Sequence, residues 1–148
     1  MNTRFAVATY ALTFMSLAQD RLVTSDELAR SIDTHPALVR RMLSMLRAAG
    51  LVETQLGPGG GARLARPPER ISLLEVYDAI GIAEDLFSVG RMNPNPLCKM
   101  NASIQATLQC TLAKPQAALR ASLDRVNIRS LLSEAAGRVK QAAAATPA

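Results

Sequence analysis

Apolar residues recur at intervals of three and four along most of this chain, which is the spacing of one face of an α-helix. In the first half, this pattern predicts helices over residues 5–20, 24–32, 36–50 and 70–80. In the second half, it keeps one register from Met100 to Val126 across Pro115, which favours a single kinked helix, with a break at Pro115 as the alternative. A last short helix is expected over residues 127–139.

The second and third of these expected helices have the features of a helix-turn-helix pair. Thr24 or Ser25 can cap the second helix, because either hydroxyl can accept a hydrogen bond from a backbone N–H of the first turn. Pro36 suits the first position of the third helix, and Gly50 suits its end. A short turn, "DTH", joins the two helices, as in DNA-binding motifs. An ordinary helical hairpin with a solvated charged face is the alternative.

The stretch "LGPGGGARLARPPERISL", residues 56–73, predicts a β-hairpin. The alternating "LVETQL" before the glycines and the "ARLA" after them can pair as two strands. Pro67 and Pro68 then end the second strand, because proline cannot donate to a ladder. A flexible linker and a phosphate-binding loop are both disfavoured, the second because no Gly-Lys-Ser/Thr and helix follow. A hairpin directly after a helix-turn-helix is a wing.

Charge supports a nucleic-acid partner for this region. The chain carries a formal net charge of +5, and its pI is near 9.9. Between Thr34 and Pro68 there is a single acid, Glu53, and there are five arginines: Arg40, Arg41, Arg47, Arg63 and Arg66. Arginine binds phosphates and guanine edges with two hydrogen bonds. The third helix is expected to carry Val39, Arg40, Ser44 and Arg47 outside its apolar stripe, with Arg41 near the edge of the stripe.

Other chemistry finds little support. His35 is the single histidine and has no nucleophile beside it in the pattern, so we expect neither a catalytic set nor a metal site, and therefore no enzyme. No apolar run approaches the ~20 residues of a membrane span, and no secretory leader pattern opens the chain. We expect no membrane partner and a cytoplasmic protein.

The two cysteines, Cys98 and Cys110, are too far apart around one helix to pair easily. Buried, inert thiols are the favoured interpretation, above all for Cys110. Cys98 precedes the long helix, where the positive end of the helix dipole can activate a thiol, so Cys98 is a candidate redox sensor. A small ligand near the "NPNP" loop is the other candidate signal.

The apolar stripe of the long helix needs a partner to cover it. A two-fold copy of the same helix is favoured over packing on the chain's own head. We therefore expect a mainly α fold, with a winged helix-turn-helix head and a long C-terminal dimerisation helix. The expected parts are a DNA-binding domain (1–83), a connecting loop (84–98), dimerisation helices (99–140) and a flexible tail (141–148).

The chain resembles the Rrf2 family of bacterial transcription regulators, and within it the YwnA-like branch. The motifs that carry the resemblance are "THPALVRR", "LRAAGLVET", "GPGGGARLARPPERISL" and "NPNPLCKMNASIQATL". The resemblance is close over residues 1 to about 85 and looser over the rest of the chain. It implies a homodimer that binds a palindromic operator and usually represses.

The resemblance also implies which residues contact DNA. The start of the supporting helix, which commonly holds phosphate, falls on Thr24 and Ser25. The recognition helix falls on His35, Pro36, Val39, Arg40 and Arg41. The wing, which enters the adjacent minor groove, falls on Gly59, Gly60, Gly61 and Arg63.

One departure from the family concerns cofactors. Cluster-binding members carry three closely spaced cysteines in the loop before the dimer helix, where this chain has Cys98 alone, so we expect no iron–sulfur cluster and no other cofactor. The predicted function is that of a sequence-specific DNA-binding regulator, a homodimeric repressor released by an unidentified signal. The alternative is a winged-helix adaptor that contacts proteins and does not read DNA.

Overall fold

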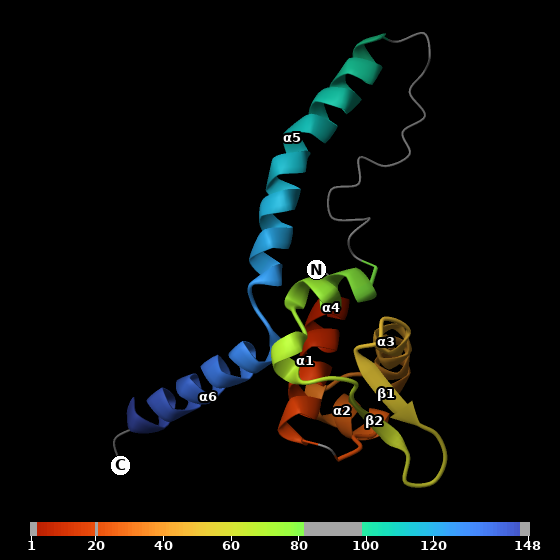
Figure 1. Ribbon diagram of the computed structural model, residues 1–148, viewed down its shortest axis with the longest axis vertical. Helices are drawn as coiled ribbons and strands as arrows, with labels where there is room; N and C mark the ends of the chain where they lie inside the picture. Colours follow the sequence, from red (N-terminus) through yellow and green to blue (C-terminus); the bar gives the residue numbers. More distant parts are fainter. Residues whose placement is uncertain (1–2, 20, 82–98, 146–148) are drawn as a thin grey trace.

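The computed structural model describes residues 3–19, 21–81 and 99–145. Its elements are α1 (Thr3–Leu17), α2 (Ser25–Ile32), α3 (Pro36–Ala48), β1 (Val52–Gln55), β2 (Gly61–Leu64), the 3-10 turn η1 (Pro68–Arg70), α4 (Leu73–Ala79), α5 (Lys99–Asp124) and α6 (Ile128–Ala145). The first four helices and the hairpin form a head, from which α5 and α6 extend in different directions (Figure 1). This confirms the mainly helical, winged helix-turn-helix fold expected from the sequence.

Helix α1 is the centre of the head. It packs against α2, α3, α4, α6 and β2, so every layer of the head meets it. Leu12 and Met15 of α1 are fully buried, as are Leu28 of α2 and Met42 and Leu46 of α3. Burying a side chain of this size contributes about 1.5–3 kcal/mol, and this shared apolar core therefore holds the helix-turn-helix in place.

Helix α4 begins with a capping box. The Ser72 hydroxyl accepts a hydrogen bond from the Glu75 backbone N–H at 3.3 Å, and the Glu75 carboxylate accepts one from the Ser72 backbone N–H at 3.0 Å. Arg66, which follows β2, donates to the same carboxylate at 2.6 Å. Burial raises the pKa of Glu75, but the bonds from Ser72 and Arg66 outweigh it, so this pKa lies below its ordinary value.

The segment between α5 and α6 pairs with the segment that enters α4. The Leu73 N–H donates to the Val126 carbonyl at 2.8 Å, and the Ile128 N–H donates to the Ile71 carbonyl at 3.0 Å. Ile71 and Ile128 are both fully buried in the head core. The chain thus returns to the head after α5, and the start of α6 belongs to the core rather than to a separate arm.

Helix α5 is continuous past Pro115, which confirms the expectation of one helix over two. Near its C-terminal end, Arg120 donates two hydrogen bonds to the Asp78 carboxylate of α4, at 2.7 and 2.8 Å. Further out, α5 carries Cys110, and its side chain is exposed. The prediction of a buried thiol at Cys110 is therefore wrong for the single chain, because this half of α5 lies beyond the head (Figure 1).

Helix α6 is longer than expected. It runs to Ala145, whereas the sequence analysis ended the last helix at 139 and began a flexible tail at 141. Alanine has the highest helix propensity, and the alanine run near the end of the chain accordingly extends the helix. The predicted connecting loop, 84–98, lies outside the described residues. Within the described ranges, no helix combines the length and the apolar character that crossing a membrane requires.

The buried position of Ile128 leads to a stability prediction. Ile128→Ala should lower the free energy of unfolding by about 2–5 kcal/mol, because it removes buried methyl groups and leaves a cavity where α6 meets the core. Leu56→Ala is the control, since Leu56 is 87% exposed and its loss should change stability by less than about 0.5 kcal/mol. Urea unfolding followed by circular dichroism measures both. Equal effects of the two substitutions would contradict the role given to the junction.

Candidate nucleic-acid interface

The turn between α2 and α3 is set by local backbone signals. Thr24 is the cap of α2, and its hydroxyl accepts a hydrogen bond from the Glu27 N–H at 3.1 Å. Asp33 takes the left-handed conformation that ends α2, with φ at 54°. His35 then occupies the cap position of α3 without a capping side-chain bond, and Pro36 follows in the first turn. His35 is left exposed at the start of α3.

Helix α3 buries one broad face and exposes another. Val39, Met42, Leu43 and Leu46 are the buried set. The exposed set consists of Ala37, Arg40, Arg41, Ser44, Arg47 and Ala48. The predicted position of Val39 outside the apolar stripe is wrong, because this residue is 0% exposed and lies on the core side of α3, one turn before Leu43. Its side chain is therefore not presented to a ligand on the exposed face.

The hairpin pairs β1 with β2 in antiparallel register, with Glu53 directly opposite Arg63. Gly59 has a φ of 76°, a left-handed conformation that favours glycine at the turn. A side chain at Gly60 would overlap the Gln55 carbonyl, so this glycine is required by the hairpin itself. The resemblance assigns these glycines to DNA contact. The hairpin gives Gly60 a second, steric requirement that does not depend on DNA.

A third segment joins the hairpin. The Val23 N–H donates to the Ala62 carbonyl and the Ala62 N–H donates to the Val23 carbonyl, both at 2.8 Å. Gly61 permits this approach, since a Cβ there would lie 2.8 Å from the Val23 carbonyl oxygen. The residue just before the Thr24 cap is thereby fixed to β2. The start of α2 and the wing are held together by direct backbone bonds.

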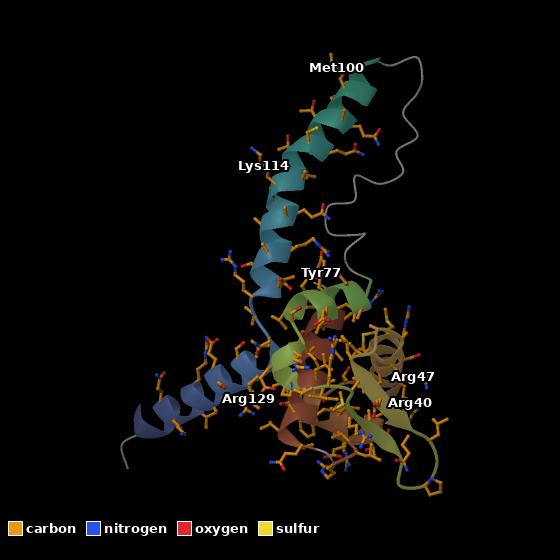
Figure 2. All side chains as sticks on the ribbon, viewed as in Figure 1. Arg40, Arg47, Tyr77, Met100, Lys114 and Arg129 are labelled. Carbon is orange, nitrogen blue, oxygen red and sulfur yellow. The ribbon has the colours of Figure 1, made fainter. Side chains whose placement is uncertain are left out.

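These elements enclose a groove of about 390 Å³ between the start of α2, the exposed face of α3 and the hairpin. Figure 2 shows Arg40 and Arg47 on this side of the head, beside the hairpin. Predicted site residues in its lining are Thr24, Ser25, Arg40, Gly60 and Gly61. His35, Pro36, Arg41, Gly59 and Arg63 lie outside the lining. The structure therefore brings together part of the predicted site in one concave surface.

Ser44, Arg47 and Thr54 also line the groove. Arg47 was one of the five arginines expected near a duplex and Ser44 was expected outside the apolar stripe, whereas Thr54 was not singled out by the sequence analysis. The Arg47 guanidinium donates to the Thr54 hydroxyl at 3.3 Å, which joins α3 to β1. The spacing of Arg40, Ser44 and Arg47 was a usable signal, because residues four and seven apart share a helix face. The position of Thr54 depends on hairpin register and had no comparable signal.

The arginines around the groove differ in their partners. Arg40 donates from Nε to the Ser25 hydroxyl at 3.2 Å and from Nη2 to the Asp26 carboxylate at 3.3 Å. Arg63 donates from Nε and Nη2 to one oxygen of Glu53, at 3.1 and 2.9 Å. No hydrogen bond or ion pair joins Arg41 to another part of the described chain. Its guanidinium is exposed and available to a ligand.

A separate ion pair lies at the base of α2. Arg21 donates two hydrogen bonds to the Glu27 carboxylate, at 3.0 and 2.8 Å. These bonds lower the pKa of Glu27 below its ordinary value. The Arg21 charge is thus matched within the head, in contrast to that of Arg41.

The sequence analysis named two candidate signal-sensing features. Cys98, the proposed redox sensor, lies outside the described residues, as does the "NPNP" loop. Within the described part of the chain, no group of three or more His, Cys, Asp or Glu side chains is arranged to hold a metal ion. The described residues therefore define a groove lined by two arginines of α3.

Comparison with known proteins agrees with this architecture. The family model Rrf2, described as an iron-dependent transcriptional regulator, matches residues 1–134. YwnA of Bacillus subtilis (strain 168), named as an HTH-type transcriptional regulator, is 37% identical over 133 residues, which make up 90% of this chain and 97% of YwnA.

Solved structures show the same fold. A crystal structure described as that of a DNA-binding protein is 32% identical, with a TM-score of 0.70 over 87% of this chain and 98% of that chain. CymR, the global cysteine regulator of B. subtilis, is 16% identical and shares the fold alone, with a TM-score of 0.65 over 90% of this chain and 96% of that one. This chain therefore belongs to the Rrf2 family of transcriptional regulators.

Proposed function

We propose that this protein is a homodimeric repressor that binds a two-fold symmetric DNA operator in a sequence-specific manner. The observation that carries the proposal is the groove, where the exposed Arg40 and Arg47 of α3 line one concave surface beside the wing. Buried charges need partners, but exposed arginines gathered on one face suit the phosphates of a duplex. The relative described as a DNA-binding protein supports the same conclusion.

The elements have separate roles in this proposal. Helix α3 is narrow enough to enter the major groove, where its exposed N-terminal residues His35, Ala37 and Arg41 meet base edges. Arg40 and Arg47 contact phosphates from the groove side. The wing carries Arg63 to the adjacent minor groove, where narrow, A·T-rich segments attract arginine. Phosphate contacts set affinity and register, and base contacts set the preferred sequence.

The proposed dimer rests on α5. Met100, Ile104 and Leu108 are spaced four apart and are 67%, 55% and 40% exposed, so they form an apolar stripe on the part of α5 that extends beyond the head (Figure 1). A second copy of the same helix covers such a stripe by two-fold symmetry. Two heads held in this way match two operator half-sites, and a dimer seated on a promoter excludes polymerase without any further contact surface.

Iron chemistry is not part of this proposal. The family description includes iron dependence. The family resemblance implies that cluster-binding members use three cysteines of one loop. This chain has two cysteines in all, and Cys110 is exposed on α5 rather than placed in that loop. The donor set does not fit a cluster held by three cysteines of one chain.

The first test concerns DNA contact by Arg40. Arg40→Ala should weaken binding to a duplex selected by the wild-type chain from a random pool by about tenfold, because a charge-assisted hydrogen bond to phosphate is lost. The slope of log affinity against log salt should fall by about 0.9. Fluorescence anisotropy at several salt concentrations measures both quantities.

Arg138→Ala is the matched control, since Arg138 is an exposed arginine on α6 that pairs with Glu134. It should leave affinity and salt slope unchanged. If both variants keep the wild-type slope, Arg40 does not contact phosphate. Absence of duplex binding by the wild-type chain would favour a protein-binding adaptor instead.

The second test concerns the dimer. Ile104→Glu places a charge in the apolar stripe of α5 and should convert the dimer to a monomer, as measured by sedimentation equilibrium. Operator affinity should then fall by about a hundredfold or more, because the two half-sites are no longer bound together.

Gln109→Glu adds the same charge to an exposed α5 position away from the stripe, and it should remain a dimer. A monomeric wild-type chain, or an Ile104→Glu variant that stays dimeric, would refute a dimer built on this stripe.

A further inference from the structure

Two arginines of the interface are held through the same two nitrogen atoms, and each has an acid among its partners. Arg40 uses Nε and Nη2 to bind Ser25 and Asp26, and Arg63 uses Nε and Nη2 to bind Glu53. A guanidinium group has five N–H donors. Among the described residues, none accepts a hydrogen bond from Nη1 of either arginine. The same edge of each group is fixed to the protein, and the other edge remains available to a ligand.

The acids lie on elements that pack or pair directly with the elements of their arginines. Asp26 lies in the first turn of α2, and its partner Arg40 lies in the first half of α3. Glu53 and Arg63 are directly opposite each other in the hairpin ladder. Each guanidinium is therefore tied to a rigid part of the head, which reduces the number of orientations that its long side chain can take.

These pairs are not needed for the fold. The side chains of Arg40 and Asp26 are 64% and 63% exposed, and those of Arg63 and Glu53 are 50% and 56% exposed. Exposed ion pairs contribute little to stability, because water and salt screen them. Asp26 adjoins the groove through Ser25 and Arg40, which line it, whereas Glu53 and Arg63 lie on the exposed hairpin ladder just outside the lining.

We propose that Asp26 and Glu53 are positioning residues that determine how strongly the interface discriminates its operator from other DNA. Contacts that depend on geometry gain from a guanidinium that is already oriented, because less side-chain freedom is lost on binding. Nonspecific binding depends on charge and not on orientation, and a carboxylate beside each arginine repels the phosphates of any duplex. Both effects raise the ratio of specific to nonspecific affinity.

This inference rests on the proposed function, because it requires DNA at the groove. The test uses the full-length chain and two duplexes of equal length and composition, one selected by the wild type from a random pool and one scrambled. Glu53→Ala should raise affinity for the scrambled duplex by about fivefold, since one negative charge is removed from near the phosphates. Affinity for the selected duplex should stay equal or fall, so the ratio should fall by about fivefold or more.

Glu53→Gln separates the two effects, because the amide oxygen can still accept from Arg63 without a charge. It should raise nonspecific affinity as Glu53→Ala does, but keep a higher affinity for the selected duplex. Asp26→Asn should reproduce this result at Arg40. Glu134→Gln is the matched control, since Glu134 pairs with Arg138 on exposed α6, and its ratio should equal that of the wild type.

Equal increases of both affinities in Glu53→Ala would overturn the inference, because the acid would then act through charge alone. An unchanged ratio in both the Glu53 and the Asp26 variants would also overturn it. In either case a wild-type chain that discriminates the two duplexes leaves the proposed function intact. A wild-type chain that binds neither duplex overturns the proposed function and this inference together.

Discussion

The backbone pairing between residues 71–73 and 126–128 is the constraint on which the rest of the structure depends. Two hydrogen bonds join these segments, and Ile71 and Ile128 enter the core from either side of them. The pairing fixes where α4 begins and where α5 ends, so it sets the directions in which α5 and α6 leave the head (Figure 1). The bidentate bond from Arg120 to Asp78 adds a second link between α4 and α5.

Through these links, the position of α5 is coupled to the proposed DNA-binding face. Helix α4 packs on α1 and α3 as well as on α5, so a change in the angle of α5 reaches α3 through one intervening helix. The proposed dimer stripe lies on the far part of α5, whereas the arginine face lies on α3 and the hairpin. The head therefore connects the proposed dimer stripe to the proposed DNA-binding face.

Much of the head could be predicted from the sequence because its signals are local. The cap at Thr24, the proline at 36 and the glycines of the hairpin each specify a turn within a few residues, and the structure has those turns. Val39 was misplaced because α3 is buried over a wider arc than a single stripe, and that arc is decided by the packing of α1, α2, α4 and β1 around it. The pairings of Arg40 with Asp26 and of Arg63 with Glu53 depend on helix crossing and strand register, which no local pattern reports. The alanine-rich end of α6 was a local signal that propensity alone would have placed in a helix.

The bridge between Val23 and Ala62 limits how this protein can be regulated. Reciprocal backbone hydrogen bonds attach β2 to the residue that precedes α2, and the backbone of Gly61 lies close against Val23. The base of the hairpin is therefore held in a fixed position relative to the helix-turn-helix. In the proposed dimer, the remaining degrees of freedom are the separation and the tilt of the two heads relative to each other. A ligand or a modification that switches this protein would then act by changing the position of α5, which sets how the two heads are held.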